Sequence, residues 1–170
     1  MQELDLPERY GTIFIANGTL SVITDREEVL ETLARCRQHL TADGQLLLES
    51  FVPDDMRGIR NYAVEDKAVT WEPVQCRSMD GQITTTLWTE APDPFEQLIY
   101  EKRRYDLHVD GALVRSEEHA LQMRWFYHWE LVMMLEKAGF VDIRSYSDYS
   151  ELPADKESKT VVVGARCPDR

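Results

Sequence analysis

The chain has 170 residues, of which 43% are hydrophobic, so it is long enough for one domain with a substantial core. Its 31 acidic and 19 basic residues give a net charge of −12, which disfavours binding to nucleic acid or to an anionic membrane. The densest basic segment, Lys102–Arg104, has acidic residues on both sides. No segment approaches the roughly 18 apolar residues of a membrane span, and the N-terminus is acidic and polar, unlike a secretion signal. We therefore expect a cytoplasmic protein.

The cysteines and histidines predict neither disulfides nor a metal site. Cys36, Cys76 and Cys167 are odd in number and far apart, so reduced thiols are expected. The four histidines are scattered, and no two of them have the spacing of metal ligands on a helix.

The first third of the chain predicts a parallel strand–helix–strand unit. Within residues 10–17, the apolar run Ile13–Ile15 is typical of a strand buried on both faces, and Asn17-Gly18 ends it. Thr24 or Asp25 offers an N-cap for an amphipathic helix over residues 25–40. Asp43-Gly44 is expected to stop that helix before a second strand at residues 45–51.

The middle of the chain predicts an antiparallel insertion of three or four long strands that is covered on one face only. Two Asp-Gly steps, Asp80-Gly81 and Asp110-Gly111, stand where hairpin turns are expected. The segments with strand-like patterns are residues 68–75, 82–90, 97–109 and 112–126.

Parallel-sheet character returns in the last third. Residues 128–138 form an amphipathic pattern, after which Gly139 suits a left-handed C-cap and Phe140 its hydrophobic contact. Residues 141–146 and 160–167 are the last two predicted strands.

Four motifs in this order resemble class I S-adenosylmethionine-dependent methyltransferases. Residues 6–51 resemble the family's fourth strand, the following helix and the fifth strand, although Ala42-Asp43-Gly44 replaces the usual Pro-Gly-Gly. Residues 127–140, which contain Y-H-W-E-L and L-E-K-A-G-F, resemble the family's Y-x-x-E-L-x-x-x-L-x-x-A-G-F signature. Residues 160–166 resemble its last strand, and small-molecule members often carry an antiparallel insertion at the same place.

The resemblance implies an α/β fold, namely a partial Rossmann-like methyltransferase sheet with an antiparallel β insertion. The family's strand order is 3-2-1-4-5-7-6, and this chain would supply strands 4, 5, 7 and 6. We expect a single domain, 1–170, in which residues 1–52 and 127–170 form the half Rossmann-like core and residues 53–126 the insertion.

The family's cofactor-binding elements have no counterpart in the sequence. Class I members bind S-adenosylmethionine through a glycine-rich loop after the first strand, and no Gly-x-Gly occurs here. Met1 falls just after the expected third strand, so we expect the cofactor-binding half to be missing from this chain. The strand containing Ile13–Ile15 would then be an open edge, and we expect a homodimer or a complementing chain to cover it. The insertion folding back over this edge is the alternative.

Candidate site residues occur in three places. Asn17, Gly18 and Thr19 resemble by position the family's turn beside the methionine end of the cofactor, or they form a simple strand-to-helix turn. Glu49 ends a strand where open α/β sheets bind ligands, so it is a candidate base or amine-orienting group, or a solvated strand end. Tyr127 and His128 are candidates for an acceptor pocket with His128 as general base, or for structural packing.

Three functions remain open. The first is a truncated methyltransferase-like protein that does not bind S-adenosylmethionine alone and acts as a dimeric binding or interaction module. The second is a small-molecule methyltransferase whose cofactor half comes from a partner chain or an upstream segment. The third is a small-ligand binding protein that uses the aromatic face of the insertion.

Overall fold

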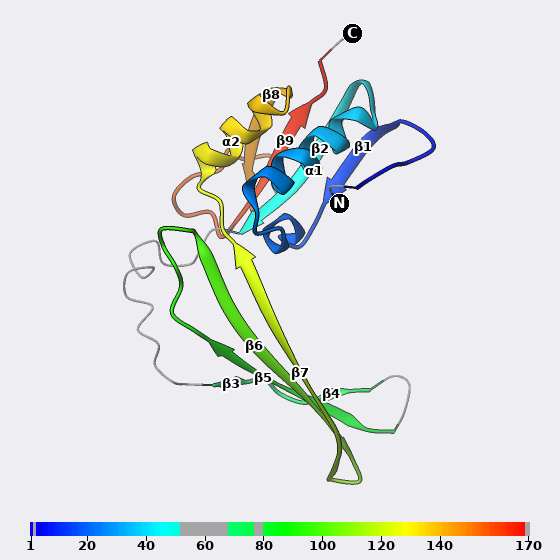
Figure 1. Ribbon diagram of the computed structural model, residues 1–170, viewed down its shortest axis with the longest axis vertical. Coiled ribbons are helices and arrows are strands. Elements are labelled where there is room, and N and C mark those ends of the chain that lie inside the picture. Colours follow the sequence, from blue (N-terminus) through cyan, green and yellow to red (C-terminus); the bar gives the residue numbers. More distant parts are fainter. Residues whose placement is uncertain (2, 52–67, 77–79, 169–170) are drawn as a thin grey trace. The chain divides into compact units, whose positions relative to one another are not determined.

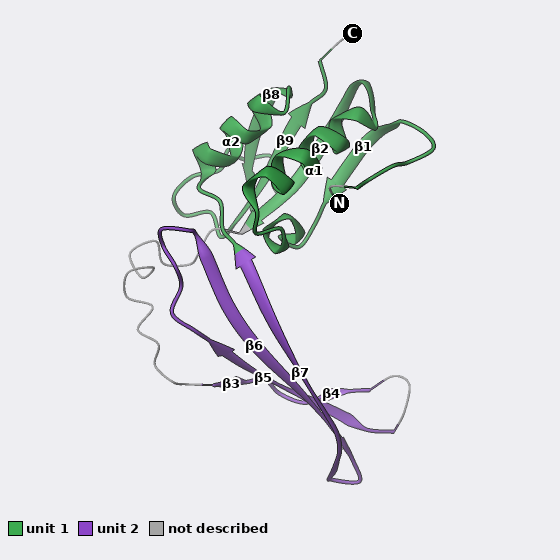
Figure 2. Ribbon diagram, in the orientation of Figure 1, with its two compact units in different colours: residues 1–56, 124–170 green, residues 57–123 purple. Residues whose placement is uncertain are grey.

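The computed structural model describes residues 1, 3–51, 68–76 and 80–168, and the chain forms two compact units (Figures 1 and 2). Unit 1 comprises residues 1–56 and 124–170, and unit 2 comprises residues 57–123. Residues 53–67 of the predicted insertion lie outside the described part of the chain.

Unit 1 is built around a four-stranded sheet of order β1-β2-β9-β8. Strands β1 and β2 are parallel, and β9 runs antiparallel to both of its neighbours, β2 and β8. This order is the 4-5-7-6 arrangement that the family resemblance implied, so the predicted fold class is confirmed. The strands are β1 (Tyr10–Ile15), β2 (Leu40–Phe51), β8 (Val141–Ser147) and β9 (Thr160–Arg166).

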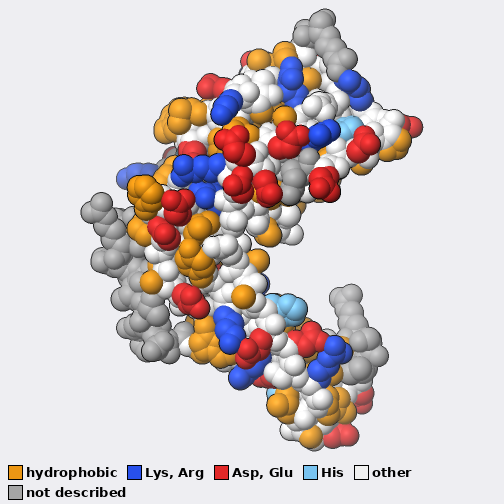
Figure 3. Space-filling view, in the orientation of Figure 1, with side chains coloured by type: hydrophobic (Ala, Val, Ile, Leu, Met, Phe, Trp, Pro, Cys, Tyr) orange, Lys and Arg blue, Asp and Glu red, His pale blue; other side chains and the backbone are white. Residues whose placement is uncertain are grey.

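Helix α1 (Arg26–Gln38) begins at the predicted N-cap and ends earlier than predicted. The Asp25 Oδ1 atom accepts hydrogen bonds from the N–H groups of Glu27, at 2.8 Å, and Glu28, at 3.0 Å. The predicted end at residue 40 is wrong because Leu40 already pairs with Tyr10 in the sheet, before the irregular Thr41–Gly44 segment. Acidic side chains gather over α1 on its outer surface (Figure 3).

Helix α2 (His128–Lys137) ends as the sequence predicts. Gly139 has a φ of +88°, and its N–H donates to the Glu136 carbonyl at 2.9 Å. The Phe140 N–H reaches the Leu135 carbonyl at 3.0 Å, and the Phe140 ring is buried in the core. These two bonds form a Schellman motif, which satisfies carbonyls that the end of the helix would leave open.

Both helices cover the same face of the sheet, where the core lies (Figure 1). The buried side chains include Val29, Leu33 and Cys36 of α1, Leu131 and Leu135 of α2, and Leu46, Leu48, Val161, Val163 and Ala165 of the two central strands. Because side chains alternate along a strand, the residues between these strand positions face away from the helices.

The prediction that Ile13–Ile15 is buried on both faces is wrong. Ile15 is buried and Ile13 packs against the core, whereas the Phe14 side chain is 74% exposed. Phe14 points to the sheet face opposite the helices, and no described element covers it there.

Unit 2 is an antiparallel sheet with the strand order β3-β5-β6-β7, in which β4 also pairs with β5 (Figure 2). The predicted turn at Asp110-Gly111 joins β6 and β7, and both residues have positive φ, 50° and 76°. The predicted turn at Asp80-Gly81 adjoins residues 77–79, which lie outside the described residues. The strands are β3 (Val69–Thr70), β4 (Val74–Gln75), β5 (Gln82–Thr89), β6 (Leu98–Val109) and β7 (Ala112–Arg124).

Two strand predictions in this part of the chain need correction. Residues 68–75 form two short strands, separated at Pro73, which has no N–H to donate to a ladder. Strand β7 ends at Arg124, and Trp125 and Phe126 beyond it are buried in unit 1.

Candidate functional site

The carboxyl ends of β1 and β2 are joined through Glu49. Asn17 and Gly18 are both left-handed, with φ of 54° and 60°, so the chain turns sharply after β1. This turn directs the Asn17 N–H to the Glu49 Oε2 atom, at 2.7 Å. The turn leads into the short helix η1 (Thr19–Val22), which the sequence analysis did not predict.

Tyr149 completes this group from the loop between β8 and β9. Its hydroxyl donates a short hydrogen bond to the same Oε2 atom of Glu49. This bond to Glu49 raises the pKa of the Tyr149 hydroxyl above its ordinary value, because the neighbouring carboxylate favours the protonated phenol. Tyr149 was not among the predicted site residues, and no local sequence signal distinguishes it.

Asp148 holds the loop that presents Tyr149. Its Oδ1 atom accepts hydrogen bonds from the Thr160 N–H, at 2.8 Å, and from the Lys159 N–H, at 3.1 Å. These bonds, chiefly the one from Thr160, lower the pKa of the Asp148 carboxyl. Both Asp148 and Tyr149 have positive φ, 48° and 59°, so the loop turns tightly at these two residues.

The second candidate region is a cavity of about 500 Å³ beside the first turn of α2. Its lining is mostly apolar, and its volume falls within the roughly 300–1,000 Å³ of small-molecule sites. Residues that line it include Phe126, Tyr127, His128, Trp129, Asp155 and Lys156.

The aromatic cluster at residues 125–129 divides between core and cavity. Trp125 and Phe126 are buried, whereas Trp129 is 71% exposed. The His128 ring contacts the Trp129 ring edge-on, with 4.8 Å between centroids. The cavity therefore offers aromatic surface and one imidazole ring to a flat or apolar molecule.

Tyr127 also has a structural role. As N-cap of α2, it donates its backbone N–H to the Glu130 carboxylate at 3.3 Å, as expected for an acidic residue in the first turn. The Glu130 carboxylate thus lies at the positive end of the helix dipole and stabilises the first turn of α2.

The structure brings some of the predicted residues together and separates others. Tyr127 and His128 share the cavity, and Asn17 contacts Glu49. Glu49 does not line the cavity: its neighbour Ser50 does, and successive residues of a strand face opposite sides of the sheet. The chain therefore presents two separate candidate regions.

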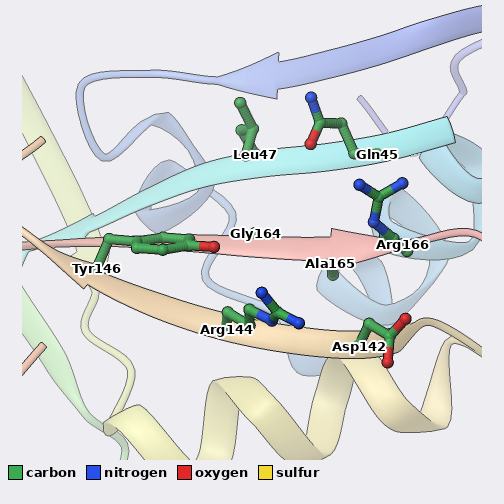
Figure 4. A pocket seen from close by; sticks show the side chains of 8 residues that line it. All are labelled: Gln45, Leu47, Asp142, Arg144, Tyr146, Gly164, Ala165 and Arg166. Carbon is green, nitrogen blue, oxygen red and sulfur yellow. The ribbon is translucent and has the colours of Figure 1, made fainter. Parts of the chain in front are cut away.

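A smaller hollow of about 140 Å³ lies on the sheet face opposite the helices (Figure 4). Tyr146, Arg144 and Arg166 surround it on β8 and β9. Gly164 leaves room for the Leu47 side chain, because an added Cβ would lie only 3.3 Å from it, whereas its distance of 3.6 Å to the Tyr146 ring would be an ordinary contact. None of the predicted site residues lines this hollow.

The remaining sequence predictions concern metals, thiols and charge. Among the described residues, no group of His, Cys, Asp and Glu could hold a metal ion, and no disulfide joins the three cysteines. Within the same residues, no helix has the length and apolar character needed to cross a membrane. Each base of the segment Lys102–Arg104 is paired with an acid: Lys102 with Glu118, Arg103 with Glu101, and Arg104 with Asp106.

Comparison with known proteins identifies the fold. No family model and no curated protein matches the sequence. Solved structures do match: an S-adenosylmethionine-dependent methyltransferase from Clostridium acetobutylicum superposes with a TM-score of 0.75 at 10% identity, over 98% of this chain and 62% of that one. A sugar N-methyltransferase from a Streptoalloteichus species superposes with a TM-score of 0.70 at 11% identity, over 99% of this chain and 60% of that one.

An amino pentose methyltransferase from Micromonospora echinaspora matches at 12% identity with a TM-score of 0.67, over 97% of this chain and 61% of that one. The chain thus spans about three fifths of the length of these methyltransferases. Its fold is a partial class I methyltransferase fold, which confirms the resemblance predicted from the motifs.

Proposed function

We propose that residues 1–170 form the acceptor-side portion of a methyltransferase fold and act as a binding module that does not hold S-adenosylmethionine alone. One observation carries this proposal. Nearly the whole of this chain superposes on the methyltransferases, but it spans only about three fifths of their length. In this proposal, methyl transfer needs strands from outside these residues.

The free edge of β1 is the place where such strands would pair. β2 occupies one side of β1, and no other strand of the described residues pairs with it. An open strand edge readily takes up another chain. We propose that a second copy or a complementing segment adds a strand at residues 13–15.

The turn after β1 has few donors to spare for a cofactor. The Asn17 N–H is bonded to Glu49, and the Thr19 N–H and hydroxyl are bonded to the Ala16 carbonyl at 3.1 and 2.6 Å. Gly18 is buried. The hydrogen-bond donors of Asn17 and Thr19 are thus already bonded within the chain, and Gly18 is not accessible. This turn does not fit a cofactor-binding loop, which supports weak binding of S-adenosylmethionine by this portion alone.

Methyl transfer by the completed assembly is the alternative function, and two features favour it. Glu49 and Tyr149 form a polar group at the carboxyl end of the sheet, where open α/β sheets bind ligands. Two of the similar structures are a sugar N-methyltransferase and an amino pentose methyltransferase. Glu49 would offer a carboxylate to a small amine acceptor, whereas the separate cavity of Tyr127 and His128 would suit an apolar acceptor.

Isothermal titration calorimetry of the purified chain with S-adenosylmethionine tests the proposal, with the mass determined by light scattering in the same buffer. We expect no heat of binding at cofactor concentrations up to the millimolar range. Micromolar binding would overturn the proposal and make the enzyme the leading function. Far-ultraviolet circular dichroism of the same sample shows that the chain is folded when the titration is made.

A further inference from the structure

The sheet face of unit 1 opposite the helices carries a row of side chains that changes from apolar to cationic. The register places Phe14 of β1 beside Leu47 of β2, and Leu47 beside Gly164 of β9. Gly164 in turn lies beside Arg144 of β8. Residues opposite one another on neighbouring strands share a face of the sheet, and Phe14 and Arg144 are both exposed. This row can therefore contact an apolar group at one end and an anion at the other.

The hollow of about 140 Å³ lies at the cationic end of this row (Figure 4). Leu47 borders it on β2, and the Tyr146 hydroxyl points toward Gly164. Gly164 contributes only backbone to the lining, so a flat group can approach the strand closely there. Because the volume is smaller than the roughly 300–1,000 Å³ of sites for drug-sized ligands, the hollow suits a single small molecule.

The polar groups around the hollow are mainly hydrogen-bond donors. Arg166 donates to the Asp43 carbonyl at 3.3 Å, which leaves its other N–H groups available. Within the described part of the chain, the side chains of Arg144 and Tyr146 have no hydrogen-bond partner. A guanidinium group donates two parallel hydrogen bonds to a carboxylate, so arginine is well suited to bind one. These donors therefore favour a carboxylate ligand.

The two arginines of the hollow differ from other arginines of the chain because they lack an acidic partner. Arg103 and Arg104 each form an ion pair with a carboxylate. Arg144 and Arg166 form none with the described residues, not even with Asp142, the one acidic side chain in the described lining. Since the whole chain has a net charge of −12, two unpaired arginines around one hollow are a local exception that attracts an anion.

We propose that this hollow binds a small carboxylate with a flat apolar body. The carboxylate pairs with Arg144 and Arg166, and the apolar body lies over Gly164 and Leu47 toward Phe14. Inorganic phosphate could use the arginines but has nothing to offer the apolar end of the row. The site is separate from the β1 edge, the Glu49 group and the cavity of Tyr127 and His128, so it goes beyond the function proposed above.

Titration of the isotope-labelled chain with phenylacetate, followed by two-dimensional NMR, tests the proposal. We expect saturable shifts of the backbone amide signals of Leu47, Gly164 and Arg144. Phenylacetamide lacks the charge and inorganic phosphate lacks the apolar body, so each is expected to bind about tenfold more weakly. A wild-type chain that does not bind phenylacetate would overturn the proposal. Equal binding of phosphate or phenylacetamide, or shifts confined to the Glu49 group or to the cavity, would do the same.

Substitutions of the charged residues test the cationic end. Arg144→Gln should raise the dissociation constant of phenylacetate about tenfold, as expected for the loss of one charge-assisted hydrogen bond. Asp142→Asn should lower it about threefold because a nearby negative charge is removed, and damage to the fold cannot produce this gain. Asp142 has a φ of 48°, which asparagine also tolerates. Arg35→Gln is the matched control, since it makes the same change in net charge on α1, on the other face of the sheet.

Phe14→Ser tests the apolar end and should raise the dissociation constant about threefold, because part of the apolar contact is lost. Arg35→Gln should leave it within about twofold of the wild type, since an exposed charge at that distance is screened by salt. An unchanged dissociation constant in both Arg144→Gln and Asp142→Asn would overturn the proposal. So would an equal increase in Arg35→Gln and Arg144→Gln. Circular dichroism of each variant excludes unfolding as the cause of weaker binding.

Discussion

The hydroxyl of Tyr149 and the carboxylate of Glu49 are hydrogen-bonded across 100 residues of sequence. The same carboxylate oxygen accepts the Asn17 N–H, so one acidic side chain connects the ends of β1 and β2 with the loop between β8 and β9. The group lies at the carboxyl end of the parallel strand pair, next to the open edge of β1.

Replacing the carboxylate should change the titration of Tyr149. We expect Glu49→Gln to lower the pKa of the Tyr149 hydroxyl toward its ordinary value of about 10, because the hydrogen bond to Glu49 is the main cause of its increase. NMR titration of tyrosine labelled at Cζ measures this pKa, and Tyr149→Phe assigns the signal. An unchanged pKa in Glu49→Gln would contradict the described contact.

The raised pKa of the Tyr149 hydroxyl determines how the stability of the protein should depend on pH. The Tyr149–Glu49 contact contributes fully below the ordinary tyrosine pKa of about 10 and is lost as the pH rises through the raised value. Tyr149→Phe should therefore have a lower free energy of unfolding than the wild type at neutral pH, and urea denaturation at increasing pH should show this difference shrink as the pH rises through the raised value.

Asp148 should make its loop sensitive to acid. Its pKa is lowered chiefly by the Thr160 N–H, so its contribution is complete above the ordinary pKa of about 3.9 and is lost as the pH falls through the lowered value. We expect Asp148→Asn to reduce the hydrogen-exchange protection of the Lys159 and Thr160 amides at pH 6 and to flatten its pH dependence. Glu151→Gln, in the same loop, is the control and should leave both amides unchanged.

Local sequence signals account for the elements that were predicted well. The N-cap at Asp25, the turn at Asp110-Gly111 and the Schellman motif around Gly139 each depend on residues within a few positions of one another. Such contacts form in the same way whatever packs around them, so a single sequence is enough to predict them.

The features that were missed depend on what lies beside each element in space. Phe14 is an apolar residue in an apolar strand, which is typical of a buried position. Its burial depends on a second layer on the sheet face opposite the helices, and the described residues do not supply one. Tyr149 reaches Glu49 only because β8 and β9 join the sheet beside β2. Neither the exposure of Phe14 nor the contact between Tyr149 and Glu49 can be predicted from the residues next to them in the sequence.

The end of α2 provides a test of backbone strain. Gly139 has a φ of +88°, and an added Cβ would lie 3.1 Å from the Arg37 guanidinium. We expect Gly139→Ala to lower the free energy of unfolding by about 1–2 kcal/mol for the left-handed backbone, and further for the contact with Arg37. Urea denaturation followed by circular dichroism measures the change.

Gly111→Ala separates the two contributions to that result. Gly111 also has positive φ, +76°, but an added Cβ there meets no atom within 4 Å. Gly111→Ala should therefore lower the free energy of unfolding only by the cost of the left-handed backbone. A smaller effect at Gly139 than at Gly111 would contradict the close approach of Arg37.

The core of unit 1 should respond strongly to loss of volume in α2. Leu135 is fully buried, so Leu135→Ala is expected to lower the free energy of unfolding by about 2–5 kcal/mol. Met133→Ala, two residues earlier on the exposed side of the same helix, should change it by less than about 0.5 kcal/mol. Similar effects of the two substitutions would mean that the helix packs through a different face.

The place of β9 in the sheet sets the order in which unit 1 can be completed during synthesis. β1 and β2 can pair as soon as residue 51 has left the ribosome, because they are joined only by η1, α1 and short connections. β8 has β9 as its only neighbour among the described strands, and β9 follows all of them in the sequence. A nascent chain that has not yet reached Thr160 therefore carries two separate fragments of this sheet, and the seven-residue strand β9 unites them.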